Sequence, residues 1–170
     1  MKLSEYFSTA KVQLDFIVAN AAVGYDGGGT MPSQELAEKT LKTNVDSTIA
    51  YINSFLPFLS PTGRIVVIAS EMAALNAQPT QMQQKLSNKF ITESEILAIS
   101  REYIQAAKNK SMENYSWSAY GTSKAMISAW ARFVLRKKLK EGQSFVCMHP
   151  GWCSTDMGGS YAPVAPKIGA

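Results

Sequence analysis

Two side chains that could work together on a proton lie four residues apart in the sequence, Tyr120 and Lys124. The surrounding pattern predicts a helix from Ser118 to about Lys140, and residues four apart on a helix share one face. A tyrosine normally releases its proton at about pH 10, and a nearby cation lowers the pKa of the hydroxyl because it stabilises the phenolate. The pair could therefore act as a general acid or base near neutral pH. The alternative is simple packing of a tyrosine on a lysine along a surface helix.

Three short apolar runs predict the strands that would position such a pair. They cover Leu14–Asn20, Arg64–Ser70 and Ser144–Met148, and continuous apolar runs of this length are typical of strands buried on both faces. Helical patterns separate them, which predicts an α/β fold with a parallel sheet and right-handed connections. Ligands of such sheets bind outside the carboxyl ends of the strands. Asn20 and Ser70 lie at two of these ends.

The segments between the predicted strands contain helices and a turn. Met1 to Leu14 reads as an amphipathic segment, and a second helix begins after the N-cap Ser33 and continues to about Phe58. Asn44 falls on the inward face of that helix, where its amide either satisfies a neighbouring backbone group or holds water in a site. The residues Pro61-Thr62-Gly63 predict a turn before the second strand.

A long polar segment and a glycine-rich loop interrupt this alternation. The segment from about 72 to 117 reads as a loop and a helix inserted at the rim of the sheet, and Thr92 to Glu95 predicts where that helix starts. Gly142 is expected to end the helix that carries Tyr120. The glycines at 24 and 27–29 predict a flexible loop, because they do not have the spacing of a phosphate-binding loop.

Composition favours a single domain and excludes several functional classes. The chain has 170 residues, of which 46% are hydrophobic and 18% charged, and its net charge is +4. The basic run Arg136–Lys140 is more typical of a helix C-terminus than of a nucleic-acid surface. No run is long enough to span a membrane and no signal peptide is recognisable, so the expected location is the cytoplasm. Cys147, His149 and Cys153 lack a fourth ligand and match no zinc pattern, so no metal site is predicted.

Several motifs, taken in order, resemble one enzyme family. These are Asn20-Ala21-Ala22 after a strand, Asn44 within a helix, Ser70 at a strand end, the Tyr120–Lys124 pair, and the segment Pro150–Met157. Together they resemble the short-chain dehydrogenase/reductase family and, within it, the NADPH-dependent carbonyl reductases. The resemblance runs from about Leu3 to Pro166.

The resemblance implies a role for each of these residues. Tyr120 would donate a proton to the carbonyl oxygen as hydride arrives, Lys124 would lower the pKa of the tyrosine and hold the nicotinamide ribose, and Ser70 would hydrogen-bond the carbonyl. Asn44 would kink its helix and hold a water that relays protons to Lys124. The residues implied for NADPH are Asn20, Tyr120, Lys124, Pro150, Gly151, Trp152 and Thr155. Those implied for the substrate are Ser70, Met72, Tyr120 and Trp152.

The chain also departs from the family pattern. The family begins with a strand and a glycine-rich turn that receives the pyrophosphate, and nothing here matches them. We therefore expect an incomplete Rossmann-like, doubly wound parallel sheet that lacks the first strands and the glycine-rich loop. Residues 1–170 would form a single partial domain, the catalytic half, with its insertion at about 72–117. Asn20-Ala21-Ala22 also replaces the more usual Asn-Ala-Gly.

Two functions from different classes follow. The first is an oxidoreductase that uses NADPH to reduce a small ketone, aldehyde or quinone. Its parent protein would be a monomer, because the insertion covers a helix face that other family members use to oligomerise. The second is a truncated, non-enzymatic protein on a reductase scaffold that binds a partner through exposed sheet edges.

Overall fold

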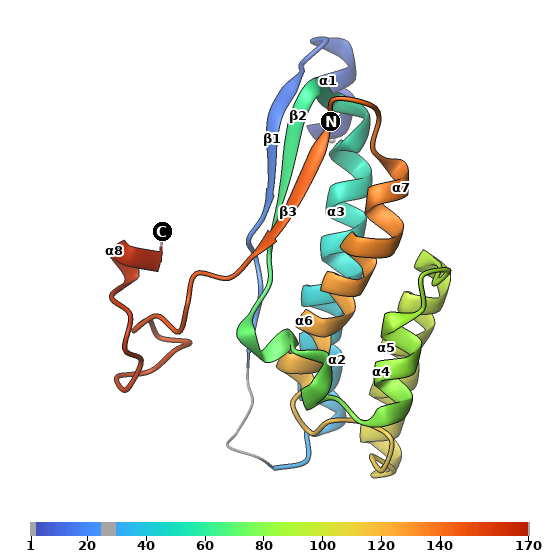
Figure 1. Cartoon of the computed structure of the whole chain (residues 1–170), viewed down its shortest axis with the longest axis vertical. Helices are drawn as coiled ribbons and strands as arrows, with labels where there is room; N and C mark the ends of the chain where they lie inside the picture. Colours follow the sequence, from blue (N-terminus) through green and yellow to red (C-terminus); the bar gives the residue numbers. More distant parts are fainter. Residues whose placement is uncertain (1–2, 25–29, 170) are drawn as a thin grey trace.

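A three-stranded parallel sheet forms the centre of the computed structural model, which describes residues 3–24 and 30–169. The strands are β1 (Leu14–Ala19), β2 (Leu59–Ile68) and β3 (Ser144–Met148), in the order β1-β2-β3 (Figure 1). Both neighbouring pairs run parallel. The predicted α/β fold with a parallel sheet is therefore confirmed.

The predicted turn at Pro61-Thr62-Gly63 is wrong, because these residues lie inside β2. Leu14 pairs with Leu59 but Phe16 pairs with Arg64, so β2 has more residues than β1 across this interval and forms a bulge. A proline in a central strand is tolerated at such a bulge, because the ladder is already interrupted there. The Gln143 amide donates to the carbonyls of Leu59 and Ser60 at 3.1 Å each, which satisfies backbone groups at the bulge.

The helices α2 (Gln34–Leu41), α3 (Thr48–Phe55) and α6 (Ala119–Trp130) lie along one face of the sheet (Figure 1). A π-helical turn, Lys42–Ser47, joins α2 to α3, so one continuous helical segment fills the region predicted from Ser33 to Phe58. A second π-helical turn, Ala131–Leu135, joins α6 to α7 (Arg136–Lys138). Fully buried apolar side chains fill the space between helices and sheet: Ile17, Leu41, Ile52, Ile65, Met126, Ile127 and Trp130.

The other face of the sheet carries apolar side chains that remain exposed. Phe16 and Val18 of β1 and Val146 and Met148 of β3 are each between 38% and 62% exposed. The strand register places these four side chains on the same face, opposite the buried Ile17. At the amino end of β1, α1 (Leu3–Thr9) packs its Phe7 ring edge-on against Phe55 and Phe58.

The segment predicted as an insertion forms α4 (Thr80–Ser87) and α5 (Glu93–Asn109), preceded by the short 3-10 turns Glu71–Ala73 and Leu75–Ala77. α4 and α5 lie outside the helical layer (Figure 1). The predicted start of α5 is confirmed, because Thr92 and Glu95 form a reciprocal capping box. None of the helices in residues 3–24 and 30–169 combines the length and the apolar run needed to cross a membrane.

Glu93 anchors the first turn of α5 to the helical layer. Its carboxylate accepts hydrogen bonds from Asn53 at 3.1 Å, from the indole of Trp130 at 3.0 Å and from Lys138 at 2.6 Å. Burial raises the pKa of Glu93, but the three hydrogen bonds together outweigh it, so the pKa lies below its ordinary value. The charged form of Glu93 therefore stabilises the folded state.

We expect Glu93→Gln to lower the free energy of unfolding by about 1–2 kcal/mol at neutral pH, because it removes a charge-assisted set of hydrogen bonds. A carboxyl whose pKa is lowered on folding contributes stability above its unfolded value of 4.5 and loses it as the pH falls through the folded value. The difference between wild type and variant should therefore shrink below about pH 4. Urea unfolding at several pH values measures this difference. A difference that grows with acidity would contradict the assignment.

Candidate active site

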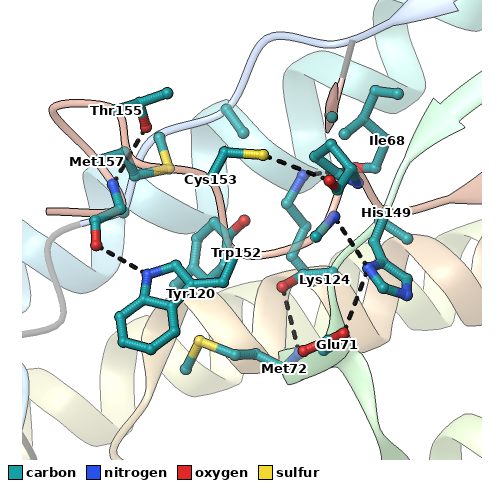
Figure 2. A pocket seen from close by; sticks show the side chains of 18 of the residues that line it. Ile68, Glu71, Met72, Tyr120, Lys124, His149, Trp152, Cys153, Thr155 and Met157 are labelled. Atoms are coloured by element: carbon teal, nitrogen blue, oxygen red, sulfur yellow. Dashed lines mark hydrogen bonds and ion pairs between the residues drawn. The ribbon is translucent and has the colours of Figure 1, made fainter. Parts of the chain in front are cut away.

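The carboxyl ends of the three strands open into one cavity of about 980 Å³ (Figure 2). Asn20 follows β1, Ser70 follows β2 and Pro150 follows β3, and all three line the cavity. The first two turns of α6 add Tyr120 and Lys124 from the helical layer. Every predicted site residue except Asn44 lines this cavity: Asn20, Ser70, Met72, Tyr120, Lys124, Pro150, Gly151, Trp152 and Thr155.

Tyr120 and Lys124 share one face of α6, as the spacing predicts. Ser118 is the N-cap, and its hydroxyl accepts the amide of Gly121 at 2.9 Å. The Lys124 Nζ lies 5.7 Å from the centroid of the Tyr120 ring. Gly121 lets this turn approach the backbone after β2, because a Cβ there would lie 3.0 Å from the carbonyl oxygen of Met72. The cation is therefore held beside the phenol.

Lys124 is only 4% exposed, although it carries an ammonium group. Its Nζ donates to the carbonyl of Ile68 at 2.6 Å, at the end of β2. Burial lowers the pKa of Lys124 to about 8, because the charged form loses its hydration. The side chain is still mostly protonated at neutral pH, so the cavity wall carries a positive charge at Lys124.

Asn44 lies behind the cavity, in the π-helical turn between α2 and α3, and is 2% exposed. Its amide pairs with the backbone of Val23, accepting from the N–H and donating to the C=O, each at 2.8 Å. It also donates to the Ser123 hydroxyl at 2.9 Å, and that hydroxyl donates to the Tyr120 carbonyl at 2.7 Å. Of the two alternatives for this buried amide, satisfaction of a backbone group is what the structure shows. The relay water stays a prediction.

Ser70 follows β2 in an extended conformation and caps the 3-10 turn Glu71–Ala73. Its hydroxyl accepts the amide N–H of Met72 at 3.2 Å. A hydroxyl that accepts in this way still has its own hydrogen to donate. Ser70 is therefore oriented to offer a hydrogen bond, and the half-exposed Met72 side chain offers an apolar surface beside it.

The loop after β3 folds back on itself and presents Trp152 to the cavity (Figure 2). The indole N–H donates to the carbonyl of Gly158 at 2.8 Å, and the Thr155 hydroxyl accepts the amide of Gly158 at 3.2 Å. Gly151 has a φ of +86°, a left-handed conformation that favours glycine, and allows the turn that begins this loop. Trp152 remains 53% exposed on one wall.

Sequence reasoning missed several residues at this site. Glu71 and His149 line the cavity and face each other, with 3.7 Å between Glu71 Oε1 and His149 Nδ1. Cys153 and Met157 also line it, and Ser123 connects Asn44 to the turn of Tyr120. Three of these residues are sequence neighbours of predicted site residues, since Glu71 follows Ser70, His149 precedes Pro150, and Ser123 precedes Lys124. This adjacency is the signal in the sequence that could have identified them.

Two other predictions concern the glycine-rich loop and the metal site. Gly24 lies against Tyr120, since a Cβ at Gly24 would be 3.1 Å from the ring. The predicted flexible loop continues through residues 25–29, which lie outside the described residues. Cys147 and Cys153 are free thiols. Within residues 3–24 and 30–169, no cluster of three or more histidine, cysteine or acidic side chains could hold a metal ion.

Comparison with curated proteins finds relatives along nearly the whole chain. Carbonyl reductase (NADPH) 1 from Sus scrofa is 34% identical over 165 residues, which cover 92% of this chain and 57% of the relative. The same enzyme from Homo sapiens is 32% identical over 165 residues, covering 92% of this chain and 60% of the relative. The chain thus spans about three fifths of the length of these relatives. No family model matches the sequence.

Solved structures show the same fold. Salutaridine reductase from Papaver somniferum superposes with a TM-score of 0.84 at 23% identity, covering 98% of this chain and 69% of that one. A short-chain dehydrogenase/reductase from Burkholderia multivorans with bound NADP gives a TM-score of 0.61 at 16% identity, covering 95% of this chain and 57% of that one. The sheet of this chain therefore corresponds to part of a Rossmann-like sheet, as predicted.

The sequence likeness to carbonyl reductases extends through most of the chain, and the fold agrees with that of solved reductases. The chain is therefore similar to NADPH carbonyl reductases in sequence and to solved short-chain dehydrogenase/reductases in fold.

Proposed function

We propose that this chain is the catalytic part of an NADPH-dependent carbonyl reductase, an oxidoreductase that reduces a ketone, aldehyde or quinone to an alcohol. The observation that carries the proposal is the convergence of Ser70, Tyr120 and Lys124 on one cavity at the carboxyl ends of parallel strands. The curated relatives are named as NADPH carbonyl reductases, which supports both the reaction and the cofactor. In this proposal, residues 1–170 form one partial domain, with residues 72–117 as its insertion.

The residues present fit the nicotinamide end of NADPH. An ammonium group has three hydrogens to donate, and among the described residues the hydrogen-bond partner of the Lys124 Nζ is the carbonyl of Ile68. The buried cation thus has donors left for ribose hydroxyls. The Tyr120 hydroxyl and the Asn20 amide would complete the ribose side, while Pro150, Gly151, Trp152 and Thr155 would hold the nicotinamide. When bound, the cofactor supplies the hydride.

The side chains of this chain would manage the proton and the developing charge. Tyr120 would donate its hydroxyl proton to the carbonyl oxygen, and Ser70 would donate a hydrogen bond to the same oxygen. The positive charge of Lys124 would stabilise the phenolate that Tyr120 becomes. Asn44 and Ser123 would keep the first turn of α6 in place, because they bind the Tyr120 carbonyl to the backbone of Val23.

We expect the 170-residue chain to bind NADPH saturably, and Lys124→Met to weaken that binding about tenfold or more, because the variant loses a charged hydrogen-bond donor. The fluorescence of reduced nicotinamide during titration measures the dissociation constant, and circular dichroism establishes that each protein is folded. A folded chain without saturable binding would contradict the proposed cofactor. That result would favour a non-enzymatic protein on a reductase scaffold.

Tyr120→Phe should lower kcat for an aromatic aldehyde or a quinone about 100-fold or more, because general acid catalysis typically contributes that much. NADPH affinity should change by no more than about threefold, since the variant keeps the ring and loses one hydrogen bond. Tyr161 is 91% exposed and does not line the cavity, so Tyr161→Phe is the matched control. Steady-state oxidation of NADPH gives both constants. Full turnover by Tyr120→Phe would exclude Tyr120 as the proton donor.

The lowered pKa of Lys124 predicts how stability depends on pH. Between pH 8 and 10.5 the unfolded chain holds a proton on this lysine that the folded chain has released, so wild-type stability rises with pH across this window. Relative to Lys124→Met, the free energy of unfolding should rise by up to about 3 kcal/mol. Guanidinium unfolding of both proteins at pH 7 to 10.5 measures the difference. A flat difference would mean that Lys124 is well hydrated in the folded state.

A further inference from the structure

Glu71 places a carboxylate in the cavity wall between two residues proposed to hold the substrate. It follows Ser70 and precedes Met72, and all three line the cavity (Figure 2). Its side chain is 69% exposed, so its own burial does not require a partner. An acidic residue at the start of a helix can interact with the helix dipole, but Glu71 begins a turn of only three residues. Local structure therefore gives little reason for an acid at this position.

His149, which faces Glu71, makes no hydrogen bond to this carboxylate, although the two groups lie close enough to form an ion pair when the imidazole is protonated. The distance of 3.7 Å between Glu71 Oε1 and His149 Nδ1 is too long for a hydrogen bond. The same Nδ1 accepts the amide N–H of Gly151 at 3.3 Å. A ring nitrogen that accepts a hydrogen bond has no hydrogen of its own to donate. The Glu71 carboxylate therefore keeps acceptor capacity for a ligand within the cavity.

The remaining walls suit an apolar body that carries a positive charge. Of the described residues that line the cavity, Glu71 is the acidic one, and Lys124 and His149 are the basic ones. The ammonium of Lys124 is buried and bound to the carbonyl of Ile68, so it does not neutralise the exposed Glu71. Met72, Trp152 and Met157 are each about half exposed on the walls. Thioether and indole surfaces accept aromatic groups, and an indole face also attracts cations.

We propose that Glu71 selects carbonyl substrates in which a protonated amine lies a few atoms from the carbonyl group. The amine would pair with Glu71 while Ser70, the preceding residue, hydrogen-bonds the carbonyl oxygen. Because Glu71 and Ser70 are adjacent in the chain, the spacing between amine and carbonyl must be short. This inference rests on the proposed carbonyl reductase function, since it names a substrate class for the same cavity.

The test compares two ketones of the same shape. β-Dimethylaminopropiophenone carries a protonated amine at neutral pH, and isocaprophenone replaces its N–H with a C–H and is neutral. The proteins are wild type, Glu71→Gln and the matched control Glu141→Gln. Glu141 is exposed, does not line the cavity, and lies just before β3, at the end of that strand opposite the cavity. Titration calorimetry measures the dissociation constant of each ketone, and steady-state kinetics in the presence of NADPH measures its KM.

We expect Glu71→Gln to weaken binding of the amino ketone about three- to tenfold, the range for a partly screened ion pair. The same variant should change the dissociation constant of isocaprophenone by no more than about twofold. Glu141→Gln should leave the dissociation constants of both ketones unchanged. High salt should reduce the advantage of wild type for the amino ketone, because salt screens exposed charges. An equal loss for both ketones, or no loss for the amino ketone, would overturn the inference.

The outcomes also separate this inference from the proposed function. Reduction of both ketones without any dependence on Glu71 would leave the reductase function standing and refute the role of Glu71. Binding of the amino ketone that depends on Glu71, without turnover of either compound by wild type, would support the recognition site and contradict the reductase function. Failure of wild type to bind the amino ketone would overturn the inference directly.

Discussion

The buried amide of Asn44 is the constraint on which the site depends. A polar group in the interior must find hydrogen-bond partners, because leaving one unsatisfied costs about 1–3 kcal/mol. Asn44 meets this requirement with groups from two distant segments, the backbone of Val23 after β1 and the hydroxyl of Ser123 on α6. Ser123 in turn binds the carbonyl of Tyr120. A strand end, a π-helical turn and the first turn of α6 are thus held in one arrangement.

The features that could be predicted from the sequence are those that local rules decide. Continuous apolar runs locate the three strands. Their parallel arrangement brings the carboxyl ends to the same edge of the sheet, independently of the conformations of the loops. The i,i+4 spacing of Tyr120 and Lys124 places them together on any helix, and the capping box at Thr92 marks a helix start through a pattern of four residues. The cavity that gathers Ser70 with the Tyr120 pair follows from these elements, so its location was also predictable.

The features that could not be predicted depend on contacts between residues far apart in the chain. Pro61 lies in β2 at a bulge, where the carbonyls of two neighbouring residues accept hydrogen bonds from Gln143, far along the chain. The partners of Asn44 depend on the register between α6 and the π-helical turn, which no local pattern encodes. Glu71 and His149 meet only because β2 and β3 are neighbours that end at the same level, where Ile68 pairs with Met148.

The three tryptophans occupy three different environments. Trp130 is fully buried, with its N–H bonded to Glu93, whereas Trp152 is half exposed on the cavity wall and Trp117 is half exposed just before α6. Indole fluorescence emission shifts to longer wavelength as hydration increases, so the three tryptophans are expected to emit at different wavelengths. A chain that retains only Trp130 reports on the integrity of the core, and one that retains only Trp152 reports on occupancy of the cavity. The molecule thus carries separate optical probes for folding and for ligand binding.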